Sequence, residues 1–537
     1  MKKNLQLLDE ATRAWNNLAE FRRERERCKR YTYGRQWDDR ITVDGQSLSE
    51  EDYIRSQGSV PLKNNMIRRL VRNVLGVWRN DFALPRPVAI DPGEQPLADV
   101  MASLLDANAQ TNRLRELYAR TMEEFLISGM AVHRKSFAPI RNRSDARTDY
   151  VHPDSFFFRS DSGDFRCWDF SLVGEIHDLP FRALVSSVVS DERHLEELMS
   201  LYNVESADSA RSCRVFEIWH RRNVSRREWC DHDRGLLISS AEKKQAPPSG
   251  SAVRLSFSQE WICTFLGPGG EILWEGPTPY AHGGHPYVVR LYPYIDGEIH
   301  SFVSDVIDQQ RYTNRLITLY DWIMRASAKG VLLFPEGSLP EGTELEDVAE
   351  EWSRFNGVIM FRPRAGTPLP QQVSSNATNI GITELLNIQL KMFEDISGVN
   401  SALQGKLESS SVSGTLFSQQ THNALTSLRD LLESFREFVI EGTMRDASNI
   451  AAFYSRKRAR RIAGATRLDR IGALRDFEDA EIDFIFEKEE AGSYLEEEEE
   501  EPEKSLSSRS ASSAASASAI SQSRGVSRST ERSRGIS

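Results

Sequence analysis

A proline-free stretch with helical periodicity constrains the fold of this chain most strongly. No proline occurs between Pro370 and Pro502, so no residue in this span is by itself incompatible with a helix interior. Residues 397–414, within this span, are mostly small and polar and include three glycines. Apolar residues recur at three- and four-residue spacing on both sides of them: Ile382, Leu385, Leu386, Leu390 and Phe393 before, and Ala424, Leu425, Leu428, Leu431, Leu432, Phe435, Phe438 and Val439 after. We therefore expect two packed helices joined by a mobile loop.

The rest of the chain combines helical and strand periodicities. Residues 4–30, the segment from Ile67 to Arg79, and residues 97–129 have the apolar spacing of amphipathic helices. Between about 150 and 300 the period changes to alternation, and Gly267-Pro268-Gly269-Gly270 joins two apolar runs as a β-hairpin turn would. Residues 480–486 alternate again. The sequence therefore predicts an α+β fold with several domains, since 537 residues exceed the usual size of one core.

A small strand–helix–strand unit is predicted between two long helices. The first helix begins near Phe302, and apolar runs at 331–334 and 358–361 flank an acidic helical segment at about 344–355. The second long helix is the one before the 397–414 loop. Order, type and length of these elements are the most informative pattern in the chain.

Several motifs within this order resemble the portal proteins of tailed bacteriophages. They are the helix-to-turn segment 31–39, the string 308–314 (Asp-Gln-Gln-Arg-Tyr-Thr-Asn), and the pattern Ser397-Gly398, Leu403-Gln404-Gly405, Ser413-Gly414. The resemblance implies a multi-domain portal fold with a β-rich wing, long stem helices, a small α/β clip, a helical crown and a disordered C-terminal tail. The implied regions are N-terminal helices and wing 1–300, first stem helix 301–330, clip 331–375, second stem helix 376–396, tunnel loop 397–414, wing helix 415–442, crown 443–490 and tail 491–537.

The resemblance also implies a function. Portal proteins form a ring, usually of twelve copies, at one capsid vertex, and double-stranded DNA passes through its axis during packaging and ejection. The expected partners are further copies of this chain, DNA, the terminase large subunit, the major capsid protein, a scaffold protein and head–tail adaptor proteins. The expected location is the portal vertex of the virion, and the host cytoplasm during assembly.

Two groups of residues are candidates for DNA contact under this resemblance. The tunnel-loop candidates are Gly398, Asn400, Gln404, Lys406, Ser410, Ser411, Ser413 and Gly414. The basic candidates belong to a helix after Gly442 that would face packaged DNA: Arg456, Lys457, Arg458, Arg460 and Arg461. The net charge of −11 favours a conduit over a clamp, because each phosphate contact by Lys or Arg adds affinity.

Cysteine usage and hydropathy predict a protein of a reducing compartment. The five cysteines never form a C-x-x-C pair, and no run approaches the roughly 18 apolar residues that span a bilayer. Asp9 and Glu10 interrupt any leader-like apolar core. We expect no export and no membrane insertion. Six glutamates at 496–501 and a Ser/Ala/Arg-rich tail at 505–537 cannot bury enough apolar surface to fold alone.

Signatures of enzymes and metal sites are not found. Gly405-Lys406 lacks the glycine spacing of a phosphate-binding loop, so we expect the packaging ATPase to be another chain. His282, His285 and His232 lack a second ligand pair, so neither metal nor cofactor is expected. Two alternatives remain open at this stage: a nucleic-acid-binding virion or scaffold protein without a channel, and, with less support, a phosphodiester hydrolase.

Overall fold

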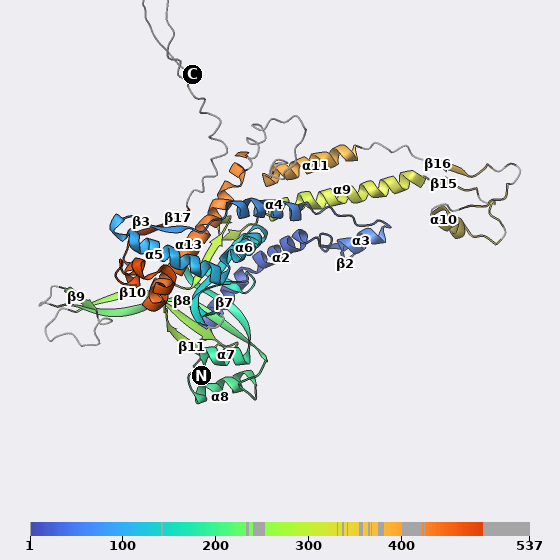
Figure 1. Cartoon of the computed structure of the whole chain (residues 1–537). Helices are drawn as coiled ribbons and strands as arrows, with labels where there is room; N and C mark the ends of the chain where they lie inside the picture. The colour runs from blue at the N-terminus through green and yellow to red at the C-terminus, as the bar shows by residue number, and fades with distance from the viewer. Residues whose placement is uncertain are drawn as a thin grey trace, which may run out of the picture. The chain divides into compact units, whose positions relative to one another are not determined.

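The computed structural model describes residues 2–486, apart from 141–142, 232–235, 240–252, 330, 336–337, 341, 354–357, 364–365, 367, 374–380, 400–421 and 424. The predicted tail at 491–537 and the surface excursion at about 239–251 therefore lie almost wholly outside the described residues. Figure 1 shows the chain, in which helices and sheets alternate along the sequence. The described part is a mixed α and β fold, as predicted.

Antiparallel strands dominate residues 130–291. One sheet has the order β11-β10-β8-β7-β6, with β9 added to β8, and a second has the order β12-β4-β5. The strand bounds are β4 Met130–Ile140, β5 Arg143–Tyr150, β6 Phe156–Ser160, β7 Phe170–Pro180, β8 Ser212–Asp231, β9 Leu236–Ser239, β10 Val253–Leu266, β11 Ile272–Pro277 and β12 Tyr287–Leu291. The hairpin predicted around Gly267 is confirmed, because β10 pairs antiparallel with β11 across this turn.

Helices and short strands complete the fold. The helices outside the stem and clip are α1 Leu5–Asn17, α2 Ala19–Thr32, α3 Glu50–Ser56, α4 Met66–Asp81, α5 Gln95–Asn112, α6 Leu114–Ser128, α7 Phe181–Val188, α8 Glu192–Tyr202, α13 Arg429–Phe453, α14 Arg456–Ala463 and α15 Ala465–Leu468. Short strand pairs join β1 Arg40–Val43 to β2 Gln46–Ser49, β13 Tyr294–Ile295 to β14 Glu298–Ile299, and β3 Arg86–Ala89 to β17 Ile482–Ile485. Single 3-10 turns are η1 Pro92–Glu94 and η2 Leu474–Glu478.

The largest core lies where α13 packs against α4 and α6. Phe435 contacts Trp78, Phe125 and Phe438 at ring-centroid distances of 5.4 Å each. Gly442 allows α13 to approach closely, because a Cβ atom there would lie 2.5 Å from the Tyr118 hydroxyl oxygen. The glycine therefore serves packing, and α13 continues through the position at which the wing helix was expected to end.

A buried ion pair also ties α13 to the second sheet. The Lys135 ammonium on β4 donates to the Asp446 carboxylate on α13 at 2.5 Å and to the Thr148 hydroxyl on β5 at 2.9 Å. Burial lowers the pKa of Lys135 and raises that of Asp446, and the partner opposes the shift in each case. The pair fixes the orientation of α13 against the sheet.

Two long helices lie at the positions predicted for the stem helices, and we call this pair the stem. They are α9 Ser304–Lys329 and α11 Ile382–Ser397, and they pack against each other. The segment between them, for which we keep the predicted name clip, contains β15 Val331–Leu333, α10 Leu345–Ser353 and β16 Gln371–Val373, with β15 and β16 antiparallel.

Three local predictions are wrong. Residues 358–361 form no strand; Val358 and Met360 are more than three-quarters exposed, and β16 takes the position beside β15. The helix predicted at 97–129 is two helices, because Arg113 adopts a left-handed conformation with φ of 53° between α5 and α6. The helix predicted at 4–30 is likewise divided at Leu18, between α1 and α2.

Candidate functional site

The stem helix α9 is anchored by buried amides within the 308–314 string. The Gln310 Oε1 atom accepts from the backbone N–H groups of Met66 at 2.8 Å and Ile67 at 3.2 Å, and its Nε2 atom donates to the carbonyl of Asn64 at 2.7 Å. Asn314 donates to the Gln36 side chain at 2.7 Å. The two bonds to Gln310 Oε1 satisfy N–H groups in the first turn of α4. The amides therefore join the stem to the helical layer.

A carboxylate pairs with two arginines on the same helix. Glu50, which begins α3, is buried and pairs with Arg315 and, at 3.3 Å, with Arg311. The two guanidinium groups balance the negative charge of Glu50 where α3 meets α9. Figure 1 shows α9 between α11 on one side and α3 on the other.

The second stem helix has an apolar face that the described chain leaves half uncovered. Leu385, Ile388, Met392 and Ile396 are between 41% and 48% exposed, and their spacing of three and four residues puts them on one side of α11. We call these four residues the α11 ridge. Their neighbour Phe393 is buried in the main core. The helix thus has a packed side and an open apolar side.

An apolar groove of about 400 Å³ lies on α9 beside α3. Leu319 and Trp322 of α9 form one wall, and Tyr53 and Ile54 of α3 form another. We call it the α3–α9 groove; its lining residues are Trp37, Ile41, Glu50, Tyr53, Ile54, Gln57, Ser59, Arg315, Thr318, Leu319 and Trp322. No local sequence pattern indicates this groove, because its walls come from segments about 260 residues apart.

Of the tunnel-loop candidates, the structure describes Gly398 alone. Gly398 ends α11 in a left-handed conformation with φ of 67°, and its carbonyl accepts from the Ser427 hydroxyl at 3.2 Å. This bond brings the end of α11 next to the segment that enters α13. The other candidates, Asn400, Gln404, Lys406, Ser410, Ser411, Ser413 and Gly414, lie outside the described residues.

The basic candidates lie on or at the start of α14, but they have different environments. The Arg458 guanidinium pairs with buried Asp145 and lies 3.8 Å from the centroid of the Tyr454 ring. Arg456 donates to the carbonyl of Gly472 at 2.9 Å. Lys457, Arg460 and Arg461 are exposed and, at this spacing, share one side of the helix. These three side chains form one exposed basic face of α14.

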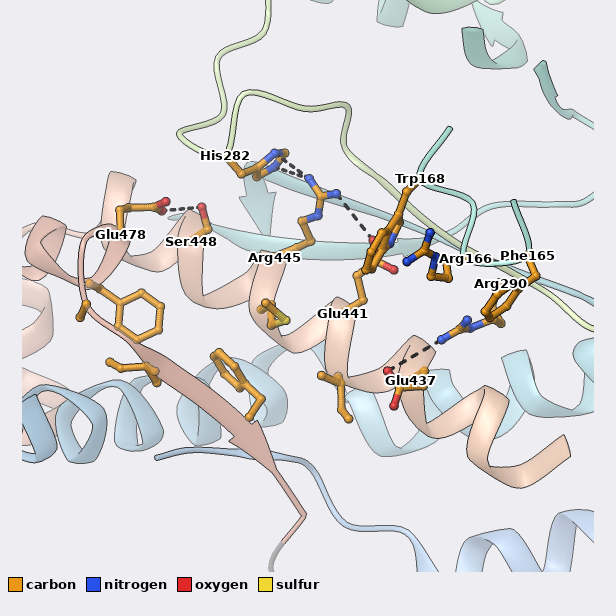
Figure 2. A pocket seen from close by; sticks show the side chains of 16 residues that line it. Phe165, Arg166, Trp168, His282, Arg290, Glu437, Glu441, Arg445, Ser448 and Glu478 are labelled. Carbon is orange, nitrogen blue, oxygen red and sulfur yellow. Dashed lines mark hydrogen bonds and ion pairs between the residues drawn. The ribbon is translucent and has the colours of Figure 1, made fainter. Parts of the chain in front are cut away.

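A second concavity, of about 680 Å³, lies beside α13 (Figure 2). Two ion pairs lie within the lining, Arg445 with Glu441 at 3.6 Å and Arg290 with Glu437 at 3.9 Å, and the Ser448 hydroxyl donates to the Glu478 carboxylate at 2.6 Å. Burial, and then Arg445, lowers the pKa of His282 to about 3, so this imidazole is neutral near pH 7. Arg166, also in the lining, pairs with Asp164 at 3.0 Å.

Two aromatic residues on the rim of this pocket were not identified from the sequence. Phe165 and Trp168 are 64% and 63% exposed, and the Arg166 guanidinium lies 4.4 Å from the Trp168 ring centroid. The loop that presents them is held by Asp169, which accepts from Ser160 and from Ser162. The arrangement suits contact with an apolar surface more than a reaction.

Two further features are absent from the described part of the chain. No cluster of three or more His, Cys, Asp or Glu side chains there has the geometry to hold a metal ion. Among the helices that the structure describes, none is both long and apolar enough to cross a membrane.

Comparison with known proteins identifies the family of this chain. A family model described as phage P22-like portal protein matches residues 8–482, and a search of curated proteins gives no match. Phage portal proteins are structural rather than enzymatic, assemble as oligomers with the capsid and DNA, and lie at the capsid vertex of the virion. Because the match covers most of the sequence, the chain belongs to the phage P22-like portal protein family.

Proposed function

We propose that this protein forms a closed ring of about twelve copies at one capsid vertex, through which double-stranded DNA enters and leaves the head. The observation that carries the proposal is the α11 ridge. Four large apolar side chains on one helix remain nearly half exposed, and monomeric proteins rarely leave such contiguous patches open. Covering this surface with another copy stabilises the assembled state by removing apolar area from water.

The regions of the chain have distinct roles in this proposal. The clip would dock the terminase large subunit during packaging and head–tail adaptor proteins afterwards. Val358 and Met360 support this role, because they give the clip exposed apolar surface that a partner could cover. The wing would meet the major capsid protein, with a scaffold protein present during assembly in the host cytoplasm. The segment 397–414 would approach the passing duplex.

Electron microscopy and light-scattering mass of the full chain test the ring. We expect particles with a central hole and a mass near twelve chains for the natural sequence. Ile388→Asp should give monomers with unchanged circular dichroism, because a charge cannot be buried in an apolar contact without a partner. Glu384→Gln, at an exposed polar position of the same helix, is the matched control and should form rings. A globular oligomer without a hole would refute the proposal.

A deletion tests the proposed loop role separately from ring formation. Removing Ser409–Ser413 should leave the ring intact and reduce the DNA packaged per head. If the deletion variant fails to assemble, the segment has a structural role in the ring.

Direct DNA binding is the second candidate function, and the exposed side of α14 favours it. Lys457, Arg460 and Arg461 together would contact about three phosphates, and each contact adds about 0.9 to the slope of log affinity against log salt. The triple change to Gln should therefore lower this slope by about 2.7 in a fluorescence-anisotropy titration. An unchanged slope would exclude α14 as the contact.

A further inference from the structure

We propose that the α11 ridge of one copy seats in the α3–α9 groove of the next copy around the ring. The inference rests on the proposed ring and goes further, because it names the two surfaces that meet. The ridge consists of Leu385, Ile388, Met392 and Ile396, and the groove lies between α3 and α9. Each copy has both surfaces, so each copy gives a ridge to one neighbour and a groove to the other.

The groove has the chemistry to take an apolar helix face. Its α9 wall contains Leu319 and Trp322, which are 45% and 50% exposed. Its acidic residue, Glu50, is already neutralised by Arg311 and Arg315. An incoming apolar side chain would therefore leave no unpaired charge in the lining. A large aromatic side chain next to aliphatic ones is also a frequent centre of binding energy in protein interfaces.

The ridge has the spacing that a helix-binding groove recognises. Its residues recur at intervals of three, four and four, which is the anchor pattern of an amphipathic helix lying in an apolar groove. From Leu385 to Ile396 the helix rises by about 16 Å. Met392 adds an unbranched side chain that adapts to an irregular wall.

A second copy is the occupant that the chain itself supplies. A contact between two different surfaces of identical chains is heterologous, and such contacts close into rings when the rotation permits. α11 packs along α9, and α3 lies on the other side of α9 (Figure 1). The ridge is on α11 and the groove is between α3 and α9, so the two surfaces belong to different sides of this helix pair. Repetition of this unit gives a continuous wall of helices. Membership of an oligomeric family supports the same occupant.

Cross-linking of the full-length chain tests the proposal. Gln57→Cys places a thiol at the exposed edge of the groove, and each of the four ridge residues is changed to Cys in turn. Chains with Gln57→Cys and chains with a ridge cysteine are co-expressed with different tags and treated with a short bis-maleimide. Asn387→Cys, exposed on another side of α11 next to Ile388, is the matched control. The described native cysteines Cys28, Cys167, Cys213 and Cys263 are buried, and the natural sequence controls for their background.

The expected result is mixed-tag dimers for at least one ridge position, and a ladder of larger products when both cysteines are on one chain. Neither single variant alone, nor the Asn387→Cys control, should give dimers above the natural background. Dimers from a ridge variant alone would show that two ridges meet, and a cross-link within one chain would show that the ridge is covered in its own chain. Rings without any of these cross-links would also overturn the inference while leaving the proposed function intact. Absence of both rings and cross-links would refute both.

Discussion

The core around α13 and the stem bury their apolar residues to very different extents. Phe435 of α13 is fully buried among aromatic rings, whereas Ile388 of α11 is 48% exposed, although both belong to amphipathic helices from one proline-free stretch. Helical periodicity alone does not distinguish them, because it shows which face is apolar and not what covers that face. The α13 core is therefore completed within one chain, whereas the α11 ridge is left half exposed, and under our proposal other copies cover it.

The largest expected effect is in the α13 core. Phe435→Ala should lower the free energy of unfolding by about 3–5 kcal/mol, because it removes a buried ring and leaves a cavity. Thermal unfolding followed by circular dichroism measures the change. Phe453→Ala is the control on the same helix, because Phe453 is 37% exposed and stacks on Phe137. This substitution should lower the free energy of unfolding by about 1 kcal/mol. Equal losses of unfolding free energy for the two variants would contradict the contrast between buried and exposed residues.

The second prediction concerns a buried carboxylate in the first sheet. Burial would raise the pKa of Glu217, but Arg134 and hydrogen bonds from His177 and Trp219 hold it at about 2. Because this pKa lies below the unfolded value of 4.5, the stabilisation is complete above pH 4.5 and is lost as the pH falls towards 2. Glu217→Gln should cost about 3 kcal/mol at pH 7 and flatten the stability profile between these values.

The matched control for Glu217 is an exposed ion pair on the same sheet. Asp178 pairs with Arg214 at 2.9 Å, and both side chains are more than half exposed. Asp178→Asn should therefore cost at most about 1 kcal/mol. Denaturant unfolding at pH 3 and pH 7 compares the two variants. If the free energy of unfolding of Glu217→Gln falls between pH 7 and pH 3 as much as that of the natural sequence, Glu217 is not the source of the acid dependence.

The third prediction concerns the junction between stem helix α9 and the α13 core, where Gln310 bonds the start of α4. Gln310→Ala leaves the backbone N–H groups of Met66 and Ile67 without the side-chain acceptor, which should cost about 1–3 kcal/mol. Amide hydrogen exchange should accelerate at Ile67, with little change in the sheets. Gln309→Ala, at the adjacent half-buried position, is the control. Faster exchange throughout the chain would show that the stem and the core unfold together.

Local signals predicted several elements correctly. The helix predicted from Ile67 to Arg79 is α4, and at its start the Asn65 side chain accepts from the Arg68 N–H group at 3.0 Å. The alternation at 480–486 does produce β17, but its partner β3 lies almost 400 residues earlier, which no local pattern specifies. The breaks at Leu18 and Arg113 carry neither glycine nor proline, so they had no sequence signal.

The predicted sites show the same limit. The string 308–314 was expected to begin a stem helix, and it provides the amides that anchor α9. By contrast, Arg458 was grouped with its basic neighbours because charge is visible in a sequence, whereas its buried partner Asp145 is 313 residues away. The run 358–361 was predicted as a strand because it is apolar. In the described chain it is exposed surface on the clip, and an apolar pattern does not reveal whether the cover comes from within the chain.

The smallest effect on folding, and the sharpest test of the comparison, comes from two adjacent residues of α11. Met392 belongs to the ridge and is 45% exposed, whereas Phe393 is 4% exposed in the main core. Met392→Ser should change the free energy of unfolding of the monomer by about 0.5 kcal/mol or less, since surface substitutions are usually this mild. It should nevertheless raise the concentration at which half of the chains are assembled by about tenfold, which corresponds to about 1.4 kcal/mol of association free energy. Phe393→Ser should instead destabilise the monomer by several kcal/mol.

Thermal unfolding at low concentration measures the stability of the monomer, and sedimentation over a concentration series measures its association. If Met392→Ser destabilises the monomer as much as Phe393→Ser does, the ridge is covered within its own chain, and the stem and the core differ only in degree.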